Sequence, residues 1–112
     1  MRKTLPIEKV KAKLIDSCLN YNPKSFIPFL LSENVKTGMP NKIRFYDFWK
    51  SMLLCTKKNS KGKLTAKFEN IKNEDSCIKY YLNFYDKKHL HSRLTIEVVE
   101  NEENIYFDTL PF

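Results

Sequence analysis

The stretch CIKYYLNFYDKKHLHSRLTIEVVE, residues 77–100, decides the fold class because apolar and polar residues alternate through both of its halves. The apolar positions are Ile78, Tyr80, Leu82 and Phe84 in the first half and Leu94, Ile96 and Val98 in the second. A period of two is typical of a strand with one buried face. The polar segment 86–88 separates the two halves, so the stretch predicts an antiparallel hairpin.

Matching the apolar faces gives an expected register for this hairpin. It pairs Leu82 with Leu94 and sets Lys79 opposite Glu97, an opposite-charge pair that stabilises such a register. The same register sets Tyr85 opposite His91.

Both histidines of the chain, His89 and His91, lie in this stretch, two residues apart. On a strand they share the face opposite to the apolar set, so we expect them on the outer face of the sheet. A metal site needs three or four ligands, and the expected neighbours supply no carboxylate or thiolate. We therefore expect no metal and no cofactor, and interpret the pair as facing solvent or a second copy of the chain.

The same alternation continues on both sides of the hairpin. It predicts a strand before it and a strand after it, with inward residues Leu64, Ala66 and Phe68 in the first and Ile105 and Phe107 in the second. Short polar turns join the four strands, which predicts an antiparallel meander with one apolar face.

The residues before the strands have helical spacing. Residues 7–19 repeat apolar positions every three or four residues, which predicts an amphipathic helix. Residues 25–31 are apolar almost all round, so we expect a short buried helix, followed by an extended piece around Val35. Asn41 can cap a third helix over residues 42–54. The apolar face of that helix is Ile43, Phe45, Phe48, Trp49 and Met52.

Helices followed by a curved antiparallel sheet predict an α+β fold, with the N-terminal helices packed on the sheet in two layers. The length of 112 residues fits one domain, residues 1–112.

Three segments carry a resemblance to a known superfamily: NYNPKSFIPFLLSENVKT (20–37), NKIRFYDFWKSML (41–53) and the last strand, IYFDTLPF (105–112). Their order resembles the nuclear transport factor 2-like superfamily, also called the SnoaL-like or cone fold. The resemblance implies a helix, a short helix, an extended piece, a third helix and a long bent sheet forming a cone. The glycine common before the third helix in that superfamily is absent, and Asn41 stands near its place.

Enzymes of that superfamily hold an Asp, His or Tyr inside the cone. None of the expected inward strand positions here is a carboxylate or a histidine, and Tyr80 is the one phenol among them. Asp47 on the third helix is a further candidate, although a solvated helix position is the simpler interpretation. We therefore expect no catalytic site, with an isomerase- or dehydratase-type enzyme using Tyr80 or Asp47 as the alternative.

The expected interior is rich in aromatic residues. One hypothesis is a pocket for a small apolar or aromatic ligand between the third helix and the sheet, and the other is a core that these rings fill. The pocket hypothesis names Phe29, Phe45, Trp49, Phe68, Tyr80, Phe84 and Phe107.

The outer sheet face is expected to carry a mixture of aromatic and polar residues that a monomer seldom exposes. Members of the resembling superfamily often dimerise through this face. We therefore predict a homodimer whose interface includes Tyr81, Tyr85, His91, Thr95 and Tyr106.

The net charge of +7 is unevenly distributed: residues 1–72 hold 16 Lys and Arg against 5 acids. Six lysines follow the third helix and run into the first strand: Lys57, Lys58, Lys61, Lys63, Lys67 and Lys72. They leave anion or nucleic-acid binding as an alternative. Arginine is scarce and no nucleic-acid-binding motif is present, so we interpret these lysines as a solvated surface.

The three cysteines, Cys18, Cys55 and Cys77, form no CxxC pair, and we interpret them as buried thiols in a reducing compartment. The basic N-terminus has no apolar run behind it, so no signal peptide is expected. No stretch approaches the roughly 20 apolar residues of a membrane span. We expect a cytoplasmic protein.

Overall fold

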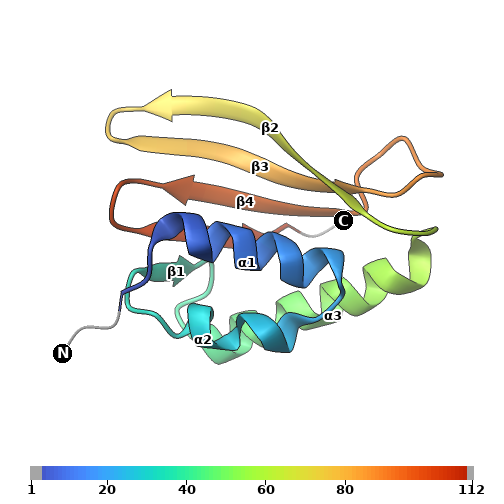
Figure 1. The fold of residues 1–112 in the computed structure, drawn as a ribbon, viewed down its shortest axis with the longest axis horizontal. Helices are drawn as coiled ribbons and strands as arrows, with labels where there is room; N and C mark the ends of the chain where they lie inside the picture. Colours follow the sequence, from blue (N-terminus) through green and yellow to red (C-terminus); the bar gives the residue numbers. More distant parts are fainter. Residues whose placement is uncertain (1–3, 111–112) are drawn as a thin grey trace.

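The computed structural model describes residues 4–110 and has helices on one face of a five-stranded sheet (Figure 1). The helical elements are α1 (Ile7–Leu19), a 3-10 turn η1 (Pro23–Phe26), α2 (Ile27–Leu30) and α3 (Lys42–Asn59). The strands are β1 (Val35–Thr37), β2 (Thr65–Glu74), β3 (Cys77–Tyr85), β4 (Leu94–Glu100) and β5 (Ile105–Thr109). The predicted α+β class, with helices packed on a sheet, is confirmed.

The sheet is mixed, so the prediction of a purely antiparallel meander is wrong. Its strand order is β1-β5-β4-β3-β2, in which β2 to β5 form the expected meander. The extended piece at Val35 adds a fifth strand, and it runs parallel to β5 with Val35 opposite Ile105. β1 is short, and its neighbour lies at the other end of the chain, so no local sequence pattern indicates the pairing.

The first helix has the predicted bounds, and its buried stripe includes Val10, Leu14 and Cys18. The third helix begins as predicted, because the side chain of Asn41 accepts hydrogen bonds from the backbone N–H groups of Ile43 and Arg44 at 2.9 and 3.2 Å. Capping of this kind satisfies donors that have no partner inside the helix.

The third helix extends five residues past the predicted end, to Asn59. Its buried residues are Phe45, Trp49, Leu53 and Thr56, at spacings of three and four. Ile43 lies off this stripe and is 70% exposed, so its place on the predicted apolar face is wrong. The short helix predicted over residues 25–31 is instead the end of η1 followed by α2, and this segment is buried on one side only: Phe26 and Leu30 are buried, whereas Leu31 is exposed.

The observed register of the central hairpin corrects the predicted one. Phe84, not Leu82, lies opposite Leu94, and Lys79 lies opposite Val99. The ammonium of Lys79 still reaches the carboxylate of Glu97 diagonally, at 3.6 Å. The alternation is correct, so the inward and outward faces of both strands are as predicted.

The strand β4 begins at Leu94, so both histidines lie in the connection between β3 and β4 and not on the outer sheet face. The prediction that they share a strand face is therefore wrong. Asp86 holds this connection, since its carboxylate accepts hydrogen bonds from the backbone N–H groups of Lys88 and His89 at 3.2 and 2.8 Å.

The strand β2 forms one edge of the sheet and contains a bulge between Glu69 and Lys72. Asn70 lies in the bulge with a positive φ of 55°. Beyond α1, the strands β2 and β3 extend without a helix over them in the view of Figure 1. Among residues 4–110, no helix combines the length and the apolar composition needed to cross a membrane.

Candidate functional site

The aromatic interior is filled where the ligand pocket was predicted. Phe45, Trp49, Phe84 and Phe107 expose at most 1% of their surface. The rings of Phe45 and Phe107 meet edge to face with centroids 5.6 Å apart, and Phe45 stacks on Trp49 at 6.5 Å. A ligand between α3 and the sheet would have to displace these rings.

Of the remaining members of the predicted pocket, Tyr80 is also buried, at 4% exposure, whereas Phe29 and Phe68 are less buried. Phe29 is half-buried and stacks on Phe26, with centroids 5.9 Å apart. Phe68 is exposed at the edge of the sheet and meets Tyr80 edge to face at 5.4 Å. The inner face is therefore less covered beside Tyr80, at Phe68 and at Ile78, which is 40% exposed.

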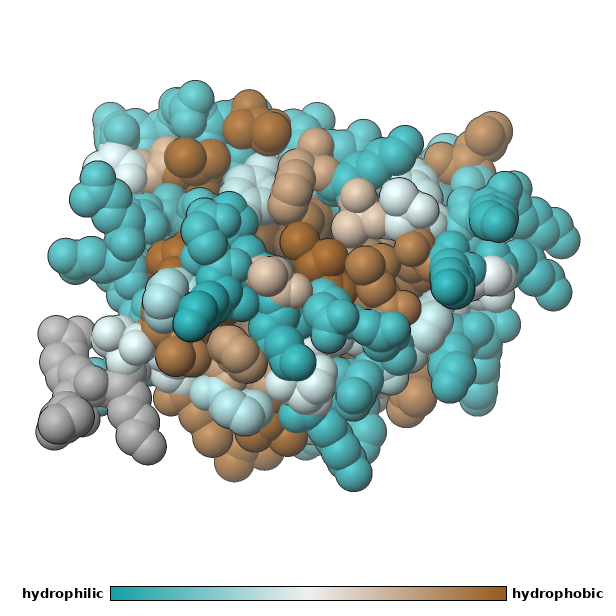
Figure 2. Space-filling view, viewed as in Figure 1, coloured by the Kyte–Doolittle hydropathy of each residue, from teal (hydrophilic) through white to brown (hydrophobic). Residues whose placement is uncertain are grey.

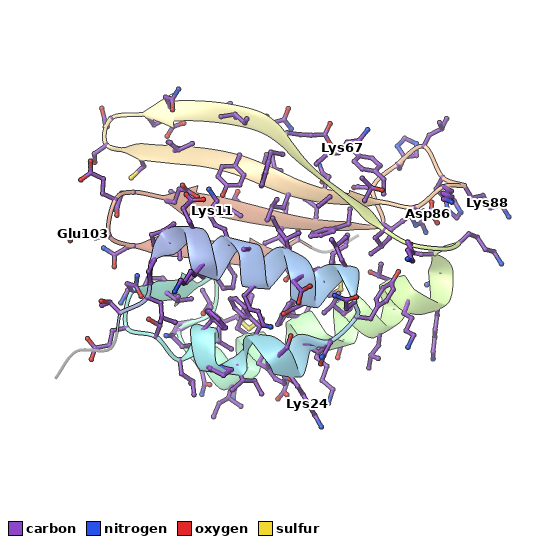
Figure 3. The ribbon with its side chains drawn as sticks, viewed as in Figure 1. Lys11, Lys24, Lys67, Asp86, Lys88 and Glu103 are labelled. Carbon is purple, nitrogen blue, oxygen red and sulfur yellow. The ribbon has the colours of Figure 1, made fainter. Side chains whose placement is uncertain are left out.

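A cluster of three polar side chains lies at this open end. The Tyr80 hydroxyl donates a hydrogen bond to Glu100 Oε2 at 2.7 Å. Lys11 Nζ lies 3.2 Å from the same oxygen and 3.3 Å from Glu100 Oε1. The Lys11 and Glu100 side chains are 18% and 11% exposed. Figure 3 shows Lys11 extending from α1 towards the sheet.

Three separate elements position this cluster. Tyr80 follows the inward alternation of β3, and Glu100 follows that of β4 one step beyond Val98. Lys11 follows the buried Val10 on α1 and also lies 3.4 Å from Glu8. The ammonium therefore bridges a helix carboxylate and a strand carboxylate.

The Tyr80 hydroxyl is a donor to Glu100 at neutral pH. Burial raises the pKa of the Tyr80 phenol far above its ordinary value, and the hydrogen bond to Glu100 and the charges of Glu100 and Glu8 raise it further. Because the phenol stays protonated, it holds the carboxylate in place and accepts no proton from it.

A pocket of about 580 Å³ lies beside the Glu100 carboxylate. Three segments line it: the start of α1, the β2–β3 turn with the start of β3, and the end of β4. The lining residues are Pro6, Ile7, Glu8, Ser76, Ile78, Glu100, Asn101 and Glu102. Within residues 4–110 the ionisable members of this lining are all acidic, and Pro6, Ile7 and Ile78 provide an apolar wall.

This arrangement can bind a hydrogen-bond donor or a cation. A carboxylate offers about four acceptor positions. Tyr80 and Lys11 make three contacts with the two carboxylate oxygens of Glu100. The carboxylate, which borders the pocket, can therefore accept a further hydrogen bond. Within residues 4–110, no group of three His, Cys, Asp or Glu side chains could hold a metal ion.

The inward-facing carboxylate was missed in the sequence. The alternation Leu94, Ile96, Val98 predicts an inward position at Glu100 when it is continued by one step. The expectation that no inward strand position holds a carboxylate is therefore wrong. Asp47, the predicted alternative, is exposed on α3.

The histidines occupy the other end of the sheet and do not form a pair. His89 Nδ1 lies 2.8 Å from Asp86 Oδ2, and the backbone N–H of Lys61 donates to the same oxygen at 2.8 Å. Burial alone would raise the pKa of the Asp86 carboxyl. The hydrogen bonds from Lys61 and His89 outweigh it and lower the pKa well below its usual range. His91 is exposed.

Four predicted interface residues, Tyr81, Tyr85, Thr95 and Tyr106, do lie half-buried on the outer sheet face, whereas His91 does not. Several polar groups on this face bond to one another. Glu69 accepts from Tyr85 and from Asn83, and the hydroxyls of Ser92 and Thr95 lie 3.0 Å apart.

The six lysines of the predicted basic surface are all exposed, as a solvated surface requires: Lys57, Lys58, Lys61, Lys63, Lys67 and Lys72. Of the cysteines, Cys18 is buried and Cys55 is exposed, so the expectation of three buried thiols is wrong.

No family model matches the chain, and no curated protein matches it. The class of protein is therefore the one that the fold defines: an α+β chain with helices on one face of a mixed five-stranded sheet.

Proposed function

We propose that this protein is a small-molecule-binding module with nuclear transport factor 2-like architecture. The order of its elements supports this architecture: a helix, a short helix, a short extended strand, a third helix and a bent sheet. The proposed ligand position is the open end between α1 and strands β3 and β4, and not the space behind α3.

The observation that carries the proposal is the Glu100 carboxylate. It is largely buried, it is fixed by Tyr80 and Lys11, and it borders a pocket with an apolar wall. Ligand pockets commonly combine apolar lining with a few fixed polar groups that orient the ligand.

The lining defines the chemistry of the ligand. Glu8, Glu100 and Glu102 supply negative charge, and among residues 4–110 no lysine or arginine lines the same pocket. Ile7 and Ile78 can cover an apolar body. The ligand class is therefore a small molecule with an apolar or aromatic body and an amine or similar donor group.

Thermal unfolding with three matched probes tests this assignment. Benzylamine, benzyl alcohol and benzoate share one ring and differ in charge. We expect benzylamine to raise the unfolding temperature most, benzyl alcohol less and benzoate not at all. Because a ligand that binds the folded state stabilises it by mass action, the shift should grow with concentration.

The Glu100→Gln variant should lose most of the benzylamine shift, because the neutral amide keeps the shape and removes the charge. Glu103→Gln is the matched control, since Glu103 lies outside this pocket and carries the same charge. An equal shift in wild type and Glu100→Gln, or a larger shift with benzoate, would overturn the proposal.

Self-association through the outer sheet face stays a prediction. The side chains of Tyr85, Asn83 and Thr95 already bond to partners on their own chain, which leaves fewer polar groups for a second copy.

A further inference from the structure

The strand β2 has a free edge. It is the last strand of the sheet, so among the residues that the structure describes no strand lies along one side of its backbone. It is ten residues long, and most of its side chains are exposed. A long exposed edge is a template for pairing with another strand.

Because of the bulge, the charged side chains of β2 on both sides of it face the same side of the sheet. Lys67 and Glu69 lie opposite Asn83 and Tyr81 of β3, which face outward. After the bulge, Lys72 and Glu74 lie opposite Lys79 and Cys77, which also face outward. The four charged residues of β2 therefore share the outer face, in the order plus, minus, plus, minus.

The inner face of the same strand carries two exposed apolar residues beside Asn73, which lies opposite Ile78. Phe68 is 52% exposed and Ile71 is 61% exposed. Figure 2 shows apolar side chains at the surface over β2 and β3. Exposed apolar residues beside a free strand edge are typical of a site that is covered in an assembly.

We propose that β2 pairs antiparallel with β2 of a second copy, about a two-fold axis between Asn70 and Ile71. This register sets Lys67 opposite Glu74 of the partner subunit and Glu69 opposite Lys72 of the partner subunit. Each contact occurs twice by symmetry. On the inner face it sets Ile71 opposite Asn70 of the partner subunit and diagonal to Phe68 of the partner subunit, so the exposed apolar side chains of the two copies lie next to each other.

The charges select this register over its neighbours. A shift of two residues in one direction sets Lys67 opposite Lys72 of the partner subunit. A shift in the other direction sets Glu69 opposite Glu74 of the partner subunit. Like charges directly opposite are destabilising in a sheet, and a shift of one residue places inner residues opposite outer ones.

Reversing the charge of Lys67 or of Glu74 tests the proposed pairing. Sedimentation velocity of the wild type should show a dimer that weakens as salt rises. Lys67→Glu or Glu74→Lys alone should raise the dimer dissociation constant about tenfold, since each creates two like-charge contacts. The double variant Lys67→Glu/Glu74→Lys should restore it to within about threefold of wild type.

These two positions are the better choice because Glu69 accepts hydrogen bonds from Asn83 and Tyr85 of its own chain. Lys67 lies 5.1 Å over the ring of Tyr85, and that contact is lost in both the single and the double variant. Recovery in the double variant therefore reports contacts between subunits. Both positions are exposed, so the variants should fold, and circular dichroism checks this.

Tyr106→Ser separates the edge dimer from one formed through the outer sheet face. The edge dimer predicts an unchanged dissociation constant for this variant. A monomeric wild type, a double variant that fails to recover, or a dimer weakened by Tyr106→Ser but not by charge reversal would each overturn the proposal. None of these variants alters the pocket at Glu100, so the ligand-binding proposal is tested independently.

Discussion

The helix-facing side of the sheet differs from one end of β3 to the other. Phe84 and Leu82 expose 0% and 1% of their surface, Tyr80 exposes 4% and Ile78 exposes 40%. All four side chains face inward by the same alternation, and they differ only in how much of each the rest of the molecule covers. A strand pattern therefore predicts which residues face inward, but not where the helices leave the inner face open.

Two carboxylates near opposite ends of β3, Asp86 and Glu100, show a related difference. Asp86 is bonded by groups of its own connection and by the backbone of Lys61, which fill its acceptor positions. Glu100 is bonded by side chains from α1 and β3 and borders a pocket. We interpret the first as structural and the second as the candidate for binding.

The largest expected effect tests the filled interior. Trp49→Ala should lower the free energy of unfolding by about 3–5 kcal/mol, because it leaves a cavity among packed rings. Ile43→Ala on the same helix is the control, and its exposed side chain should cost no more than about 0.5 kcal/mol. Urea unfolding measures both. A loss below about 1 kcal/mol for Trp49→Ala would show an open space behind α3.

The next effect depends on pH and tests the structural role of Asp86. Because its pKa is lower in the folded chain, its bonds stabilise the fold above about pH 4, the unfolded value, and this contribution is lost as the pH falls further. The free energy of unfolding should be larger for the wild type than for Asp86→Asn at pH 7. This difference should become smaller towards pH 3.

Asp47→Asn is the control for this pH series, since Asp47 is exposed on α3. Its difference from wild type should stay small at both pH values. A gap for Asp86→Asn that is the same at pH 7 and pH 3 would contradict the role of the ionised carboxylate.

A smaller effect is expected at Lys11, with opposite signs for stability and binding. Lys11→Met should lower the free energy of unfolding by about 1 kcal/mol, because Glu100 loses a charged partner. The same change should tighten benzylamine binding, because the competing ammonium is gone. Isothermal titration checks this, with the exposed Lys9→Met as control. Unchanged or weaker binding would argue against Glu100 as the anchor.

The smallest effect is expected at Ile78, and Leu82 on the same strand serves as its comparison. Ile78→Ala should cost below about 1 kcal/mol, whereas Leu82→Ala should cost about 2–5 kcal/mol. Equal losses in urea unfolding would mean that the end of β3 at Ile78 is as closely covered as the middle.

The sequence predicted most of the fold because strands and helices carry periodic signals. The period of two placed Tyr80, Leu82 and Ile96 on the inner face, and the cap at Asn41 placed the start of α3. The β3–β4 connection could not be predicted in this way. It is held by hydrogen bonds from backbone and ring N–H groups to Asp86, which leave no periodic trace.

The candidate site was only partly accessible from the sequence. Tyr80 was placed on the inner face, and Glu100 could have been placed by continuing the alternation of β4. Their meeting with Lys11 depends on how α1 lies across the sheet, a tertiary contact between residues 89 positions apart in the chain. The sequence left open whether the aromatic rings enclose a pocket or fill the space behind α3, because that depends on how side chains from α3 and the sheet pack together.

Chemical-shift mapping by NMR tests the central claim most directly. Benzylamine is titrated into ¹⁵N-labelled protein, and the perturbed backbone amides are located. The account predicts the largest shifts at Ile7, Ile78 and Glu100, and their loss in Glu100→Gln. Shifts centred on Trp49, Phe84 and Phe107, or no shifts at all, would contradict it.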